Sequence, residues 1–395
     1  MKKLTLATLA CYLQILAAFS QTTPPADTST YKARKLSIEE IDVVSGYYMQ
    51  NGSHSAVTGG IGTEKLTDIS NTIEVRLSRS DKHLRKHTLN LELGVDHYSS
   101  ASSDKIDPST ISSASSADTR VYPSVGYSVK NVRGLTLGAT ASFSKEYDYA
   151  SAGFGVQVAK ASKDGNRELS LKLQSYLDSW RVILPVELRP GGQKDEGPSP
   201  RNSLSGSLSY SQVVNQRFQY SFLLDLVTQS GLLGTSYQRV YFDNGTETYE
   251  RLPGSRFKVP VGVRASYFIG DRVILRPFYR YYIDDWGVKA HTAELEMPVK
   301  VTPFFSISPF YRYYTQTAAD YFAPYKEHHA SAGYYTSDYD LSAFNSGFAG
   351  AGFRFTPQNG VFGLARWTML ELRYGHYSRN DGLGSNIISL NARFK

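Results

Sequence analysis

Cysteine is almost absent from this chain of 395 residues, and the only one is Cys11. It lies in an apolar N-terminal stretch that we expect to be removed, so the mature chain is predicted to have no disulfide, no thiol chemistry and no cysteine-ligated metal. Attachment of a lipid to Cys11 is disfavoured, because the preceding residues TLA fit a lipobox poorly and the apolar run continues beyond it. The sequence carries no cofactor motif, and we expect no cofactor.

Long apolar runs, helical repeats and clusters of one charge are also missing. Beyond the N-terminus no segment approaches the ~20 apolar residues of a membrane helix, which excludes a polytopic helical membrane protein. The lack of a helical period excludes coiled coils and helical solenoids, and an aromatic content of 13% excludes disorder over most of the chain. The net charge of +7 comes from 43 basic and 36 acidic residues spread along the chain, which disfavours a nucleic-acid partner.

The N-terminus has the pattern of a secretory signal peptide over residues 1–20. Two lysines follow the first methionine, residues 4–19 are almost wholly apolar, and we expect cleavage after Ser20. Residues 21–38 are polar and contain two prolines, which predicts a flexible periplasmic leader. Residues 39–395 are then expected to form a single domain.

Alternation of apolar and polar residues with a period of two dominates this domain. Residues 89–96 (LNLELGVD) and 388–395 (ISLNARFK) are clear examples. One face of each run is apolar, and the other carries glycine, hydroxyl, amide or charged residues. Many runs extend over roughly 10–14 residues, near the ~9–11 that a tilted membrane-spanning strand requires.

The alternation predicts an all-β fold, a transmembrane antiparallel outer-membrane β-barrel of about 16 strands in a Gram-negative bacterium. Counts of 14 and 18 stay open, because the segments 51–70 and 229–255 could each contain a hairpin. Short turns alternate with long loops, as in barrels with short periplasmic turns and long extracellular loops. The predicted strands cover residues 41–50, 70–79, 87–98, 120–130, 134–146, 149–161, 166–178, 202–213, 216–228, 256–269, 272–284, 289–300, 303–315, 340–355, 366–378 and 385–395.

Aromatic residues agree with this prediction. Tyrosines gather near predicted strand ends, as at Tyr279, Tyr281 and Tyr282, where amphipathic rings would form girdles at the level of lipid headgroups. The last strand carries Phe394 one residue before Lys395. A terminal phenylalanine is the feature that the barrel-insertion machinery reads, so we expect this machinery and outer-membrane lipid as partners.

Five strings are more specific than generic barrel sequence: residues 41–70, 95–107, 115–128, 144–168 and the C-terminal SNIISLNARFK. Together they resemble, over nearly the whole mature chain, an uncharacterised family of Bacteroidota outer-membrane proteins, the domain-of-unknown-function family 3570. The resemblance implies an outer-membrane β-barrel and no particular substrate. Through neighbouring genes it also suggests small lipoprotein partners and a link to periplasmic redox or flavin chemistry, although this chain carries no flavin, haem or thiol motif.

Charged residues on the inward face of the barrel are the first candidate site. Side chains alternate between the two faces of a strand, so parity assigns each charge to a face. Arginines of the strand 272–284 should lie beside glutamates of the strand 289–300, with Arg312 on the next strand. Such a belt would either filter solutes by charge or form an ordinary polar wall with satisfied ion pairs. The residues assigned to the lumen are Glu74, Arg76, Glu92, Asp96, Lys172, Asp225, Arg264, Arg276, Arg280, Glu294, Glu296, Arg312, Arg354, Glu371, Arg373 and Arg393.

The loop over residues 97–120 is the second candidate. Its carboxylate and hydroxyl oxygens could bind calcium or narrow the lumen, and a solvated surface loop is the alternative. Its candidate residues are Ser99, Ser100, Ser102, Asp104, Asp107 and Asp118. His328 and His329 form a weak metal candidate, because a metal site needs three or four ligands in a fitting geometry. We therefore expect no metal.

We expect no enzymatic activity. Asp96, His97 and Ser99 contain the residue types of a catalytic triad, but neighbours on a strand point to opposite faces. No nucleophile-elbow motif is present. The predicted function is therefore a porin-like channel for small polar solutes with an Arg/Glu lumen. The alternative is a plugged barrel that acts as a scaffold for a periplasmic or surface lipoprotein or a redox-linked assembly.

Overall fold

The computed structural model describes residues 35–99, 113, 117–184, 189 and 197–395. The predicted signal peptide and most of the predicted leader lie outside the described residues. No helix in the described part of the chain is long and apolar enough to cross a membrane.

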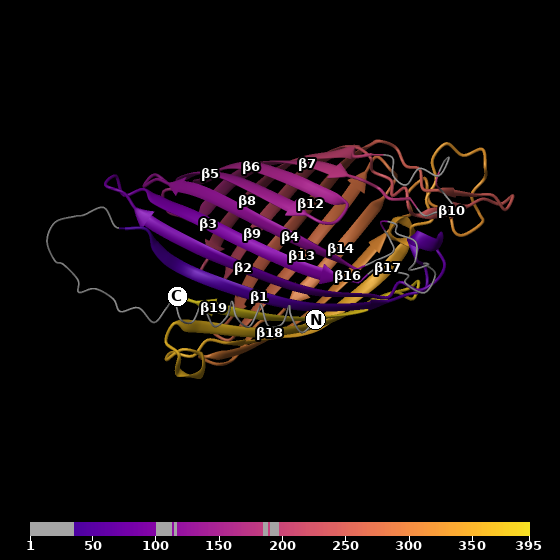
Figure 1. Ribbon diagram of the computed structural model, residues 1–395. Coiled ribbons are helices and arrows are strands. Elements are labelled where there is room, and N and C mark those ends of the chain that lie inside the picture. Colours follow the sequence, from indigo (N-terminus) through magenta and orange to yellow (C-terminus); the bar gives the residue numbers. More distant parts are fainter. Residues whose placement is uncertain (1–34, 100–112, 114–116, 185–188, 190–196) are drawn as a thin grey trace. The chain divides into compact units, whose positions relative to one another are not determined.

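The described residues form sixteen antiparallel strand positions that close on themselves in chain order (Figure 1). Strand β9 pairs with β12, and β1 pairs with both β2 and β19, which closes the sheet. Closure leaves no strand edge unpaired, as a β-structure in a bilayer requires. The barrel strands are β1 (Ser37–Asn51), β2 (Leu66–Ser80), β3 (Lys86–Tyr98), β4 (Asp118–Lys130), β5 (Leu135–Lys145), β6 (Tyr149–Ala161), β7 (Arg167–Trp180), β8 (Ser199–Asn215), β9 (Phe218–Gly231), β12 (Ser255–Ile269), β13 (Val273–Asp284), β14 (Lys289–Glu296), β15 (Val299–Thr302), β16 (Phe305–Gln316), β17 (Phe344–Phe355), β18 (Trp367–Arg379) and β19 (Gly384–Phe394).

Strands β14 and β15 share one position in the barrel. Both pair with β13 on one side and with β16 on the other. The break falls at Met297 and Pro298. Proline has no N–H to give to the ladder, which accounts for an interruption at this point.

The predicted barrel is confirmed, and every predicted strand overlaps one observed position. The segment 229–255 does contain a hairpin, made of β10 (Arg239–Tyr241) and β11 (Glu247–Tyr249), but it forms a separate two-stranded sheet and adds nothing to the barrel. The strand predicted from residue 340 begins only at Phe344. The preceding residues form the 3-10 turn η4 (Tyr339–Leu341), capped by the carboxylate of Asp338.

Many large apolar side chains of the strands point away from the lumen. On β3, Leu91 and Leu93 are 41% and 48% exposed, and Glu92 between them points to the opposite face. Outward apolar residues of this kind on so many strands suit contact with lipid. The same outward position is held by Val125, Leu137, Phe154, Val156, Leu171, Leu173, Leu204, Phe222, Leu295, Tyr311, Leu372 and Leu390.

The connections differ between the two ends of the barrel. At one end they are short turns, for example residues 216–217 and 303–304, and the longest is 356–366 with the turn η5 (Val361–Gly363). At the other end lie the long loops 52–65, 232–254 and 317–343. The first of these contains η1 (Ala56–Thr58), and the second contains the β10–β11 hairpin, which extends beyond the barrel strands in Figure 1.

Candidate functional site: the charged lumen and the loop cap

Four neighbouring strands, β12, β13, β14 and β16, supply the charged wall of a cavity of about 890 Å³. The charged residues of this wall are Arg264, Arg276, Arg280, Arg312, Glu294 and Glu296. Four arginines face two glutamates, so this side of the lumen has an excess of two positive charges. Aromatic side chains of β13, β16, β17 and β18, together with several amide and hydroxyl side chains, complete the lining.

Glu296 connects two arginines from different strands. Its Oε2 accepts a hydrogen bond from Arg276 at 3.2 Å, and its Oε1 accepts one from Arg373 at 3.0 Å. Arg373 reaches across β16 and β17 and lies 5.1 Å from the ring centre of Phe310. Gly350, directly opposite Phe310, makes room for that ring, because a Cβ at Gly350 would lie 2.6 Å from it. The glycine thus allows an ion pair between strands that are not neighbours.

Two further arginines of the lumen are paired with carboxylates. Arg312 Nε lies 2.7 Å from Glu294 Oε2, and Arg354 Nε lies 2.6 Å from Glu371 Oε2. Arg373 also contacts Glu371 at 3.3 Å. The arginine of each pair is substantially exposed, so each pair stabilises the fold by only about 0–1 kcal/mol. Their larger effect is to decide which positive charges remain uncompensated.

The seam between the first and last strands carries its own charge network. Arg393 of β19 lies 2.9 Å from Asp42 and 3.2 Å from Glu40 of β1. Arg76 of β2 lies 3.2 Å from Glu40 and 3.2 Å from Glu74. These contacts join residues from opposite ends of the sequence across the seam where the barrel closes.

Arg264 and Arg280 differ from these arginines. In the described part of the chain no carboxylate lies within ion-pair distance of either one. Both side chains are exposed in the cavity, and each guanidinium carbon lies 5.3 Å from the ring centre of Phe278, within the range of a cation–π contact. Arg280, expected beside the glutamates of the next strand, lies directly opposite Thr292.

The opposite wall is more acidic and richer in hydroxyl groups. Glu92 lines a separate cavity of about 370 Å³ together with Arg120 and Tyr122. Asp96 accepts a hydrogen bond from the Tyr122 hydroxyl at 2.9 Å and lies opposite Arg120. The structure therefore places positive charge near β12 and β13 and acidic groups near β3.

Several residues of this site were not predicted from the sequence. Phe278, Phe310 and Phe348 point inward and carry arginines on their rings, and the same parity rule applied to phenylalanine could have found them. Glu40 was missed because the first strand begins at Ser37 and not at residue 41, whereas Asp42 lies within the predicted strand and the parity rule could have found it. Their partner Arg393 is distant in sequence, and no local signal marks that pairing.

The three long loops 52–65, 232–254 and 317–343 pack on one another; we call this assembly the loop cap. The rings of His54 and Tyr339 stack with centres 4.0 Å apart. Arg239 Nη1 donates a hydrogen bond to the carbonyl of Val57 at 2.7 Å. Backbone hydrogen bonds in both directions join Arg251 to Tyr335. Each loop thus contacts the other two through named bonds or ring contacts.

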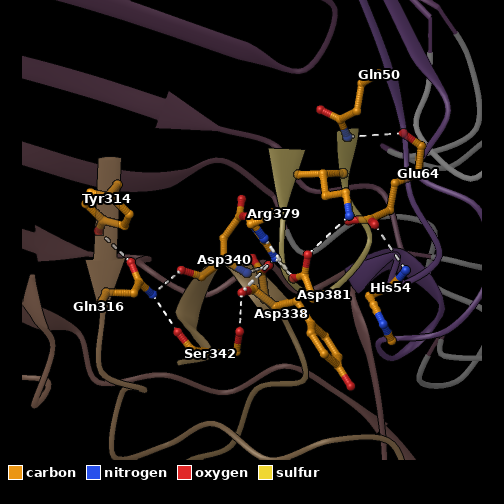
Figure 2. Close-up of polar contacts among 12 residues, drawn as sticks. Gln50, His54, Glu64, Tyr314, Gln316, Asp338, Asp340, Ser342, Arg379 and Asp381 are labelled. Carbon is orange, nitrogen blue, oxygen red and sulfur yellow. Dashed lines mark hydrogen bonds and ion pairs between the residues drawn. The ribbon is translucent and has the colours of Figure 1, made fainter. Parts of the chain in front are cut away.

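A polar network ties the loop cap to strand ends (Figure 2). Arg379 at the end of β18 has a side chain only 2% exposed and contacts the carboxylates of Asp340 and Asp381. Gln50 at the end of β1 donates a hydrogen bond to the carbonyl of Glu64, and a carboxylate oxygen of Glu64 accepts from the backbone N–H of His54. The loops 52–65 and 317–343 are therefore both fixed to the barrel rim.

Two carboxyl groups with raised pKa values lie in the loop cap. Glu250 is 5% exposed and accepts hydrogen bonds from the Thr336 hydroxyl and the Thr235 backbone N–H. Burial, together with the nearby charge of Asp338, raises the pKa of Glu250 to about 8. Burial, with the charge of Asp340, raises the pKa of Asp338 to about 7. The loop cap therefore contains two carboxyl groups that titrate near neutral pH.

Most of the predicted calcium loop cannot be placed. Ser100, Ser102, Asp104 and Asp107 lie outside the described residues. Ser99 is bonded to Thr67, its Oγ accepting the Thr67 N–H at 3.0 Å.

Asp118 also has local partners. Its carboxylate accepts the backbone N–H groups of Thr119 at 2.6 Å and Tyr147 at 3.0 Å. Both described members of the loop set, Ser99 and Asp118, thus hold strand ends.

His328 and His329 point to different partners. His328 is buried, its Nε2 lies 2.9 Å from the carbonyl oxygen of Thr336, and burial lowers its pKa. His329 is exposed and lies 2.6 Å from Asp243. No group of three or more metal-ligating side chains occurs among the described residues. The two histidines act in the described structure as loop contacts.

A family model described as "Protein of unknown function (DUF3570)" matches residues 96–361. The chain belongs to this family. The match is narrower than the resemblance expected over nearly the whole mature chain, since the strings at 41–70 and at the C-terminus lie outside it. The description names neither a bacterial group nor an activity. No curated protein matches the chain.

Solved structures of similar architecture include three porins from Pseudomonas. OccK2 (OpdF) of P. aeruginosa, solved with glucuronate, has 9% identity and a TM-score of 0.42 over 90% of this chain and 96% of the porin. A BenF-like porin of P. fluorescens Pf-5 has 9% identity and a TM-score of 0.42 over 90% and 98% of the two chains. OccD3 (OpdP) of P. aeruginosa has 9% identity and a TM-score of 0.43 over 92% and 91%.

Proposed function

We propose that this family member is an outer-membrane channel through which small polar solutes diffuse, with selection by charge in the lumen. The observation that carries the proposal is the arginine-rich cavity wall enclosed by a barrel whose outward residues are apolar. A charged, water-accessible wall inside an apolar exterior is the arrangement of an aqueous pore. Outer-membrane lipid and the barrel-insertion machinery are the partners that this location requires.

The test is single-channel conductance of the refolded chain without residues 1–20 in planar bilayers. Steady ohmic steps are expected, and reversal potentials in a salt gradient should show a preference for anions because the cavity wall carries excess positive charge. Arg276→Glu should move the reversal potential toward cation preference. Arg133→Gln, in the turn between β4 and β5, is the control and should leave it unchanged. A correctly folded barrel that shows no steps would refute the channel.

The second candidate function is a barrel that serves as a scaffold for a periplasmic or surface lipoprotein. The compact loop cap favours it, because three long loops held by buried contacts offer a defined surface. Under this proposal the refolded barrel is electrically silent yet heat-modifiable. Deleting residues 21–34, part of the predicted leader, should then abolish recovery of the partner lipoprotein with the barrel.

A further inference from the structure

We propose that Arg264, Arg280 and Phe278 form a binding site in the lumen for small organic carboxylates. The inference deepens the proposed channel function and rests on it for its place in a transport path. The three residues lie together on the neighbouring strands β12 and β13 and face the same cavity. Arg264 and Arg280 are the arginines of the charged wall that have no carboxylate within ion-pair distance among the described residues.

The two guanidinium groups are available to a solute. Arg276, Arg312 and Arg373 each have a carboxylate within 3.2 Å, whereas Arg264 and Arg280 have none among the described residues. A guanidinium presents a planar fork of donors that fits the two oxygens of a carboxylate, and a charge-assisted bond of this kind is stronger than a neutral one. An anion that enters the cavity can therefore bind to two guanidinium groups that are not paired with a described carboxylate.

The backbone leaves room beside these forks. Arg280 lies opposite Gly262 on β12, so the facing strand presents no side chain at that position. Ser266 and Thr292 line the same cavity and offer hydroxyl groups to the remaining lone pairs of an oxyanion. Glu294, which lies opposite Phe278, carries a negative charge that would repel an anion, but it is held by Arg312 at 2.7 Å. Its pairing reduces the repulsion that a bound anion would meet.

Aromatic rings give the site a preference beyond charge. Phe278 supports both guanidinium groups, and Phe344, Phe348, Tyr314 and Tyr377 line the same cavity. An apolar body attached to the carboxylate could pack on these rings, which inorganic anions cannot do. The chemistry therefore favours a carboxylate with an apolar or aromatic body over phosphate or chloride.

The first experiment measures how benzoate, acetate and inorganic phosphate block the chloride current through the channel. In parallel, calorimetry measures the binding of benzoate to the refolded barrel in detergent. Benzoate should bind and block at lower concentration than acetate or phosphate. Arg264→Gln and Arg280→Gln should each weaken benzoate binding about tenfold or more, and the double variant should abolish it. Phe278→Leu should weaken benzoate binding and leave acetate binding unchanged.

Arg133→Gln is the matched control and should bind benzoate as the parent does, and heat-modifiability confirms that each variant folds. Benzoate binding that survives the double variant, or phosphate binding as tightly as benzoate, overturns the site. The channel proposal fails separately: a silent barrel that still binds benzoate through Arg264 and Arg280 refutes diffusion and retains the site. A conducting barrel that does not bind benzoate refutes the site alone.

Discussion

Replacing Glu250 by glutamine should make the loop cap less sensitive to pH. The carboxyl group is buried, accepts hydrogen bonds from Thr336 and Thr235, and has a pKa raised from 4.5 to about 8. Between pH 4.5 and about 8, Glu250 therefore keeps its proton in the closed cap and loses it when the loops open. The open form binds fewer protons in that window, so the free energy that keeps the cap closed falls as the pH rises from about 4.5 to 8.

The magnitude follows from the size of the shift. Each pH unit in the window costs up to about 1.4 kcal/mol, which amounts to on the order of 5 kcal/mol once Glu250 is fully ionised. Asp338 adds to the effect, because burial and Asp340 raise its pKa to about 7. Glutamine has nearly the same shape and can still accept the Thr235 N–H, but it cannot ionise. The two shifts are of similar size, so Glu250→Gln should remove about half of the pH dependence and leave that of Asp338.

The assay is amide hydrogen exchange of the cap segments between pH 5 and 9, corrected for the intrinsic exchange rate at each pH. Protection at Arg251 and Tyr335, which are joined by backbone hydrogen bonds, reports the closed cap. In the parent, protection should decrease steeply with rising pH, and in Glu250→Gln the decrease in log protection should be about half as large, because Asp338 still titrates. Glu327→Gln, at an exposed carboxylate in the loop 317–343 of the same cap, should behave as the parent. Equal pH dependence in the parent and in Glu250→Gln would refute the reasoning.

Three further predictions concern the lumen and the cap. Glu296→Gln removes the carboxylate shared by Arg276 and Arg373, so reversal potentials should shift toward stronger anion preference, and no shift would show that these arginines do not control permeation. Gly59→Ala places a Cβ 2.7 Å from the Tyr241 ring at a positive φ and should cost the cap about 1–3 kcal/mol, seen as faster proteolysis of the loops with an unchanged thermal transition of the barrel. Arg379→Met leaves Asp381 beside an apolar side chain and should loosen the cap by a few kcal/mol, whereas protection equal to the parent would contradict the anchoring role of the arginine.

Sequence reasoning located the strands because their signal is local. Alternation with a period of two lies within each strand, and two departures from the predicted strands occur where another local feature intervenes. One is the capped turn at Asp338, which delays the start of β17, and another is Pro298, which divides one strand position in two. The charges on the inward face follow from the same parity.

The pairing of those charges depends on which strands become neighbours and in what register. Arg393 meets Asp42 only because β19 closes against β1, and Arg373 reaches Glu296 only because small residues on β17 let it pass. No local pattern distinguishes the paired Arg276 from Arg280, which lies on the same strand and face four residues later. Whether Arg280 is available to a solute therefore depends on the register in which β13 pairs with β14.

By itself the sequence determined an all-β barrel of about sixteen strands with an apolar exterior and a charged interior, because side-chain alternation is fixed by the backbone of each strand. The tertiary structure decided which arginines remain without a carboxylate, which phenylalanine supports them, and how the loops bury Glu250 and bring it near Asp338. These features arise from contacts between residues tens to hundreds of positions apart, and only closure of the barrel brings such residues within the few ångströms over which ion pairs and hydrogen bonds act.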